Sequence, residues 1–211
     1  MTKRIRSLSI FVVGTVIVPF LAAGCMKRQY VKRDTYALDV SRPGPVSSVE
    51  TDAVLRVRTL RVSPRYESKS FVYRSGDLSY ETDYYNQFFA SPDIMITEEV
   101  REWLQGSGLF RQVFDYTGQA EHTHVLEGEV IDLYGDFSRG TQPKAAIDVR
   151  FRLIRDTPGR SEILFQKHYR RELPVGIDTA EALVGGWNKA LEDILTDLEK
   201  DLREVDLKKE G

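Results

Sequence analysis

A long apolar stripe near the C-terminus is the feature that most constrains the fold of this chain. From about residue 179 to residue 205, apolar side chains recur at the spacing that puts them on one face of an α-helix. They are Leu183, Val184, Trp187, Ala190, Leu191, Ile194, Leu195, Leu198, Leu202 and Val205. Such a stripe must pack on a sheet or on another helix; the alternative is an oligomer or partner surface at its far end.

Two local signals mark this helix. Asp178 followed by Glu181 predicts a capping box, in which each carboxylate satisfies a free amide of the first turn. Gly185 and Gly186 weaken the helix by roughly 1 kcal/mol each relative to alanine, so we expect close packing at that point.

Three predicted strands precede the helix. Residues 124–137 read as one long strand, and residues 147–154 place apolar side chains on every second position, which is typical of a half-buried strand. In residues 162–173, Ile163, Phe165, Tyr169 and Leu173 share one face. Short turns join them, so they predict an antiparallel meander.

The first half of the chain adds further strands and one more helix. Residues 53–62 alternate but change phase between Val57 and Leu60, which indicates a bulge or twist, and residues 70–82 read as a hairpin. Ser91 and Pro92 are typical of an N-cap and first helical residue. The order predicts a single α+β domain, with a mostly antiparallel sheet and two helices packed on one face.

The N-terminus has the pattern of a bacterial lipoprotein signal peptide. A basic start is followed by an apolar run and by small residues that end at Cys25, the only cysteine of the chain. We expect cleavage between Gly24 and Cys25, a diacylglycerol thioether on Cys25 and an acylated amine, which anchor the chain to a membrane. The alternatives are an uncleaved signal anchor and an ordinary secretory signal cut near Ala23.

These signals divide the chain into four parts. Residues 1–24 are the signal peptide, 25–50 a lipidated N-terminus and flexible tether, 51–205 the α+β domain and 206–211 a polar tail. Fully extended, a tether of about 25 residues reaches on the order of 80 Å. Within it, residues 36–38 form a candidate edge strand that docks the tether on the domain.

Charge and cysteine content exclude several classes of protein. The net charge is −2, and loss of the basic leader makes the remaining chain more acidic, so nucleic acid is not an expected partner. With Cys25 lipidated, no thiol remains for disulfides or for catalysis.

A dense aromatic run is the candidate partner surface. It contains Tyr84, Tyr85, Phe88 and Phe89, shortly after Tyr80. Packing between strand and helix is the default interpretation of such a run, and an apolar patch for a partner or a lipid tail is the alternative.

His122 and His124 are weak candidates for a metal site. Their spacing puts both imidazoles on one face of a strand, and a third ligand would come from Glu127, Glu129 or His168. Solvated histidines at a strand end are the simpler interpretation. Without a nucleophile elbow or a phosphate-binding loop, the sequence predicts no enzyme, no metal and no cofactor.

Several segments together resemble the auxiliary lipoprotein family of ABC-type lipid transport systems. They are the lipobox ending at Cys25, Tyr36-Ala37-Leu38, the strand 55–62, Phe71-Val72-Tyr73-Arg74, the stretch 84–92 and Trp103-Leu104. The resemblance covers roughly residues 35–202.

The resemblance implies a role beside a transporter built from an ATPase, a permease and a periplasmic mammalian-cell-entry-domain protein that carries lipid. The lipoprotein would bind the periplasmic component and hydrolyse no nucleotide. Met26 is not aspartate, which by the enteric sorting rule favours the outer membrane over the inner one. The alternatives are a structural or assembly lipoprotein of another outer-membrane complex and a metal-dependent periplasmic enzyme; a homo-oligomer also stays open.

Overall fold

The structure is a computed structural model that describes residues 32–114, 121–140 and 142–207. Cys25 and Gly24 lie outside the described residues. The elements are β1 (Asp34–Tyr36), β2 (Val54–Val57), β3 (Arg61–Val62), β4 (Ser70–Arg74), β5 (Tyr80–Phe88), α2 (Pro92–Gly106), β6 (Gln112–Phe114), β7 (His124–Asp136), β8 (Lys144–Thr157), β9 (Arg160–Pro174) and α3 (Ala180–Arg203).

All the strands belong to one sheet, which is organised around β7. One edge of β7 pairs with β8 and, beyond it, β9, and both pairings are antiparallel as the meander predicts. The other edge of β7 pairs in turn with β2, β3 and β4, all of them parallel to it. The sheet is therefore mixed, and the expectation of a mostly antiparallel sheet was wrong. The parallel pairs arise because the chain returns to β7 through α2, whereas the sequence pattern reveals only strands joined by short turns.

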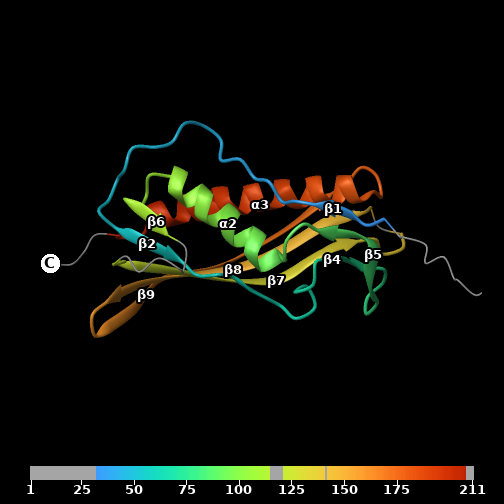
Figure 1. Ribbon diagram of the computed structural model, residues 1–211, viewed down its shortest axis with the longest axis horizontal. Coiled ribbons are helices and arrows are strands. Elements are labelled where there is room, and N and C mark those ends of the chain that lie inside the picture. The colour runs from blue at the N-terminus through green and yellow to red at the C-terminus, as the bar shows by residue number, and fades with distance from the viewer. Residues whose placement is uncertain (1–31, 115–120, 141, 208–211) are drawn as a thin grey trace, which may run out of the picture. The chain divides into compact units, whose positions relative to one another are not determined.

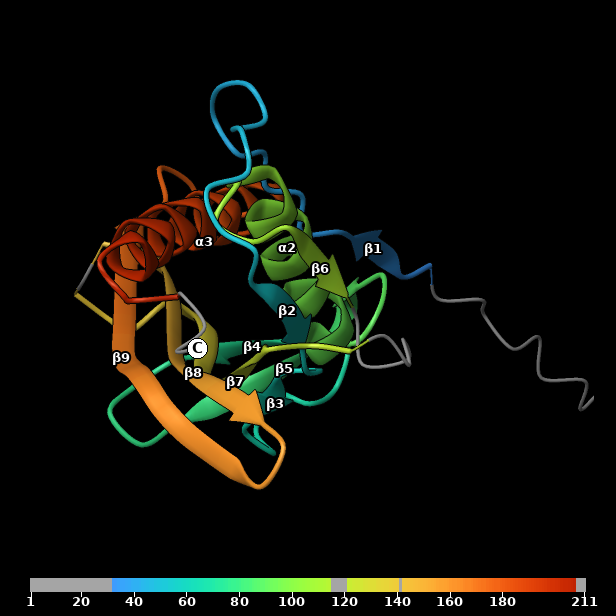
Figure 2. The same ribbon diagram turned by 90° about the vertical axis from the view of Figure 1, so that its left-hand side faces the viewer.

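Helices α2 and α3 cover one face of this sheet (Figures 1 and 2), so the predicted α+β fold is confirmed. The apolar stripe of α3 is buried, and Trp187 is its largest member. The Trp187 indole N–H donates to the backbone oxygens of Tyr134 and Ala146 at 3.3 and 3.2 Å. None of the described helices is both long enough and apolar enough to cross a membrane.

The helix ends follow the sequence signals with one shift. Ser91 is the N-cap of α2 and Pro92 its first residue, as predicted. Thr179, and not Asp178, caps α3, because its hydroxyl accepts from the Ala182 amide at 3.2 Å. Gly186 packs closely, since a Cβ there would lie 2.6 Å from the Cβ of Ala145.

Residues 33–50, which the sequence places in a tether with a candidate docking strand at 36–38, belong to the same compact unit as the domain. Strand β1 pairs in parallel with the end of β5, and Leu38 is buried in the core. The following residues, 39–50, cross over the helices (Figure 1) and are called the strap. The Ser47 amide donates to the Gly106 oxygen at 3.1 Å, which ties the strap to the end of α2.

Glu199 of α3 is the main polar contact of the strap. Its carboxylate accepts from Arg42 of the strap at 2.8 and 2.9 Å, from Trp103 of α2 at 2.8 Å and from Arg203 at 2.8 Å. Burial alone would raise the pKa of Glu199, but the hydrogen bonds from Arg42 and Arg203 outweigh it and lower the pKa. The ionised carboxylate therefore joins the strap to both helices.

Candidate partner-binding surface

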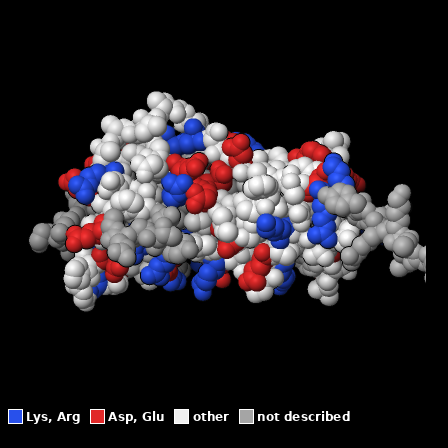
Figure 3. All heavy atoms as spheres, viewed as in Figure 1, with Lys and Arg blue, Asp and Glu red and all other residues white. Residues whose placement is uncertain are grey.

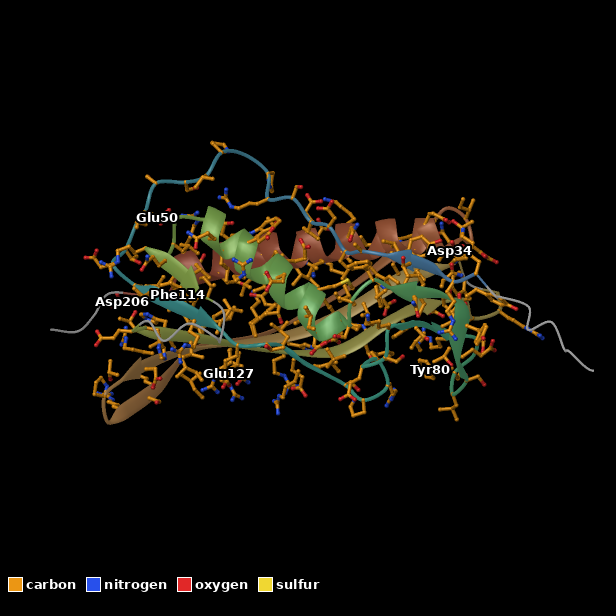
Figure 4. The ribbon with its side chains drawn as sticks, viewed as in Figure 1. Asp34, Glu50, Tyr80, Phe114, Glu127 and Asp206 are labelled. Carbon is orange, nitrogen blue, oxygen red and sulfur yellow. The ribbon has the colours of Figure 1, made fainter. Side chains whose placement is uncertain are left out.

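Strand β5 has an edge that is only partly covered. On one side it pairs with β4, and on the other β1 reaches only Asn86–Phe88. Among the described strands none pairs with the outer edge of residues 80–85. Figure 4 shows Tyr80, at the start of β5, at the same end of the domain as Asp34, where the described chain begins its first strand.

An irregular segment of β5 presents two neighbouring tyrosines. Ser70 is opposite Gln87 and Val72 opposite Thr82, so β5 has extra residues between these two pairs. Successive side chains of a regular strand point to opposite faces, but here Tyr84 and Tyr85 are both well exposed, at 57% and 59%. Their rings meet edge to face, with centroids 5.4 Å apart.

Asp83 holds this irregular segment in shape. Its carboxylate accepts from the amides of Tyr85 and Asn86 at 2.6 and 3.0 Å, and from the Tyr73 hydroxyl at 2.5 Å. Burial would raise the pKa of Asp83, but these hydrogen bonds outweigh it and lower the pKa, so the group stays ionised. Asp83 was not among the residues predicted from the sequence; its place just before the aromatic pair was the available signal for a local turn.

The predicted aromatic set divides between surface and core. Phe89, just after β5, is 71% exposed, whereas Phe88 is 2% exposed and packs on Phe71 and Trp187 with centroids 4.6 and 5.3 Å apart. Phe88 is therefore a core residue and cannot contact a partner. The remaining candidate surface, called the aromatic surface below, consists of Tyr84, Tyr85 and Phe89.

The start of the described chain contacts this surface directly. The guanidinium carbon of Arg33 lies 4.4 Å from the centroid of the Tyr84 ring, within the range of a cation–π contact. Tyr36 of β1 donates its hydroxyl to Glu181 of α3 at 2.9 Å and packs on Phe71. These contacts fix the point at which the N-terminal chain meets the domain, next to the aromatic surface.

The candidate metal ligands are separated. His122 contacts Asp156 at 3.2 Å, whereas His124 is 1% exposed and shares a 2.8 Å contact between its Nδ1 and the Thr123 hydroxyl. His168 pairs with Asp148 on the opposite side of β8. In residues 32–114, 121–140 and 142–207 no group of three or more His, Cys, Asp or Glu side chains is arranged to hold a metal ion.

His124 and the proposed third ligands have other roles in the structure. Burial, with a smaller effect from the positive charge of Arg155, lowers the pKa of His124 to about 4. Glu127 pairs with Arg58 at 2.6 Å, and Glu129 lies 3.5 Å from Arg150. The residues that could have completed a metal site therefore belong to ion pairs.

Comparison with known proteins identifies the fold. No family model matches the sequence, and no curated protein matches it. The chain is similar to the crystal structure of protein XCC0632 from Xanthomonas campestris, which carries the family label DUF330, with 17% identity, coverage of 79% of this chain and 92% of that one, and a TM-score of 0.68.

Two further solved structures share the arrangement. An uncharacterized protein is 14% identical, with 81% of this chain and 99% of that one covered and a TM-score of 0.63. The hypothetical protein CT253 from Chlamydia trachomatis is 7% identical, with 72% and 98% covered and a TM-score of 0.51. At these identities the likeness shows a common fold.

Proposed function

We propose that this chain is a non-enzymatic lipoprotein, anchored through Cys25 to the outer membrane and facing the periplasm. It acts as an auxiliary component of an ABC-type lipid transport system, and its aromatic surface binds the periplasmic mammalian-cell-entry-domain protein. The observation that carries the proposal is the exposed pair Tyr84 and Tyr85, held in place beside the point where the N-terminal chain meets the domain.

The chemistry of the aromatic surface fits a protein partner. Tyrosine offers a large apolar ring and a polar hydroxyl at low cost in conformational entropy, which is why it is frequent among the residues that dominate binding energy. Asp83 fixes the backbone under the two rings before any partner arrives. A surface organised in advance loses less entropy on binding than a flexible one.

Its position also fits a membrane-anchored protein. The chain that carries the lipid in this proposal joins the domain at β1, against β5. Anchoring therefore confines the aromatic surface close to one membrane and raises its effective concentration toward a partner that extends to that membrane. The motifs from Tyr36-Ala37-Leu38 to Trp103-Leu104 supply the link to lipid transport.

Site-specific photo-cross-linking tests the partner. A benzophenone amino acid at Tyr85 should cross-link to the mammalian-cell-entry-domain protein in intact cells. The matched control is the same amino acid at Ile163, which is 57% exposed on β9 and has nearly the same exposure as Tyr85. Equal cross-linking from both positions, or none to that protein from Tyr85, would contradict the proposal.

A binding measurement with purified components tests the residues. The double substitution Tyr84→Ser and Tyr85→Ser should weaken binding of the purified transport component by about 10-fold or more, since truncating central aromatic contacts typically costs over 1 kcal/mol. Ile163→Ser is the control and should bind as the wild type does. Unchanged affinity in the double variant would remove the aromatic surface from the interface.

The anchor is tested separately. Cys25→Ala should leave the domain folded but without acyl mass, and should release it from the membrane fraction. A variant that stays in that fraction, together with an unmodified wild-type N-terminus by mass spectrometry, would overturn the lipoprotein assignment.

A further inference from the structure

A groove on the sheet face opposite the helices collects four arginines. Arg58, Arg61, Arg150 and Arg152 line it together with Glu127 and Glu129, and its volume is about 390 Å³. Figure 3 shows basic and acidic side chains along the border of the molecule that lies below the strands in Figure 1. This set of residues, called the arginine groove, has no role in the proposed function.

The fold builds the arginine groove from two sides of β7. Arg150 and Arg152 are alternate residues of β8 and so point to the same face, opposite Glu129 and Glu127 of β7. On the other side, the chain breaks between β2 and β3 after Val57. This break explains the change of phase in the sequence, and it brings Arg58 and Arg61 to the same groove while Leu60 stays in the core.

The charges inside the arginine groove are not balanced. Four guanidinium groups face two carboxylates, which leaves two positive charges in excess. Only Arg58 makes a close ion pair, at 2.6 Å to Glu127. Arg152 lies 3.7 Å from Glu127, and Arg150 and Arg61 lie 3.5 and 3.8 Å from Glu129. Arg152 also donates its Nε–H to Gln166 at 2.9 Å. Most of the other guanidinium N–H groups are therefore available to another acceptor.

Arg170 on the same face has the opposite arrangement, in which carboxylates outnumber the guanidinium group. It alone meets three carboxylates, those of Asp132 at 2.9 Å, Asp148 at 3.2 Å and Glu172 at 2.8 Å. The outer face therefore contains one arginine saturated with acceptors, and next to it a groove in which donors exceed acceptors. The excess of positive charge is local to the groove.

We propose that the arginine groove binds a phosphate group, either as free phosphate or as a phosphomonoester headgroup of a lipid. Guanidinium groups bind phosphate through paired N–H donors, and a groove with arginines on both walls can hold the oxygens of a tetrahedral anion from two sides. A dianionic phosphate matches the two excess positive charges. Glu127 holds Arg58 in place through the close ion pair, and the negative charges of Glu127 and Glu129 both oppose binding of the anion.

Titration calorimetry on the full chain in a non-ionic detergent tests the site. The probes are inorganic phosphate, dihexanoyl phosphatidic acid, and dihexanoylglycerol, which lacks the phosphate. Binding of both phosphate probes with similar affinity identifies free phosphate as sufficient, whereas binding of phosphatidic acid alone identifies the lipid headgroup. Binding of neither, or equal binding of dihexanoylglycerol and phosphatidic acid, would overturn the proposal.

Substitutions assign the binding to the groove. Arg61→Gln combined with Arg150→Gln keeps the close Arg58–Glu127 pair and should lower affinity for the phosphate probe by 10-fold or more. The matched control is Arg160→Gln at the first residue of β9, an exposed arginine outside the groove, which should not change the affinity.

One carboxylate gives a readout of opposite sign. Glu129→Gln removes a negative charge from the groove, so it should tighten phosphate binding several-fold. If the affinity fell equally in the double variant and in Arg160→Gln, or if Glu129→Gln weakened binding, the groove would be an ordinary solvated array of ion pairs. Unchanged unfolding temperatures in these variants separate binding from folding.

Discussion

The two faces of the sheet hold their side chains by different forces. On the face under α2 and α3, Trp187 lies fully buried among Phe71, Phe88 and the backbone of β7 and β8. On the outer face, Arg170 and the arginine groove rely on ion pairs that stay partly exposed. Burial of apolar surface contributes most of the folding free energy, whereas exposed ion pairs contribute little. We therefore expect one face to determine stability and the other to be free to bind.

Trp187 gives the largest expected effect. Trp187→Ala should lower the free energy of unfolding by about 3–5 kcal/mol, because it leaves a cavity at the centre of the aromatic cluster and removes an indole hydrogen bond. Denaturant titration measures it. The control is Tyr85→Ala on the aromatic surface, which should change the free energy by less than about 0.5 kcal/mol. Similar losses of unfolding free energy in both variants would show that the buried face does not contribute more to stability than the exposed aromatic surface.

His124 should have an intermediate, pH-dependent effect on the free energy of unfolding. It belongs to the buried side of the sheet under α2 and α3, called the closed face below. The pKa of His124 is about 4 in the folded chain, whereas a histidine in the unfolded chain has the ordinary pKa of 6.5. Between these two pH values the imidazole is protonated in the unfolded chain and neutral in the folded one. Stability linked to His124 is complete above about pH 6.5 and is lost as the pH falls toward 4, by up to about 3 kcal/mol.

Comparison of the wild type with His124→Gln isolates this contribution, because the acidic groups titrate alike in both. As the pH falls from 7 to 4, the wild type should lose more unfolding free energy than His124→Gln does. A constant difference over that range would show that His124 is solvated in the folded state.

The Arg58–Glu127 pair gives the smallest effect and probes the outer face. Arg58→Ala should cost less than about 1 kcal/mol of stability, since both groups are partly exposed and gain little from pairing. A double-mutant cycle with Glu127→Ala should give a coupling of about 0.2–1 kcal/mol. A coupling above about 2 kcal/mol would mean that the outer face also supports the fold.

The sequence predicts the closed face well because burial leaves a periodic pattern. The stripe that includes Leu183 and Leu198 is buried as expected, and Ser91 and Pro92 mark the start of α2. Parallel pairing was missed because β2, β3 and β4 meet β7 only after the chain passes through α2. Alternation along one strand does not show whether the neighbouring strand runs parallel or antiparallel to it.

The candidate site was predictable only in part. Tyr84 and Tyr85 were picked out by composition, but Phe88 in the same run is core, because it packs on Phe71 and Trp187, which are distant in the sequence. The arginine groove needs the register of Arg150 and Glu129 across two strands and the break before Arg61. Neither relation is visible along a single segment of sequence.

The pairing of β1 with β5 shortens the chain segment that can separate the domain from the membrane. From sequence alone, about 25 free residues gave a reach on the order of 80 Å. With β1 paired to β5 from Asp34 onward, only the residues between Cys25 and Asp34 remain, and even fully drawn out they span about 30 Å. If Cys25 carries the lipid, the first strand of the domain lies within about 30 Å of the bilayer surface. The proposed transport component would then have to reach to within that distance of the membrane in order to bind.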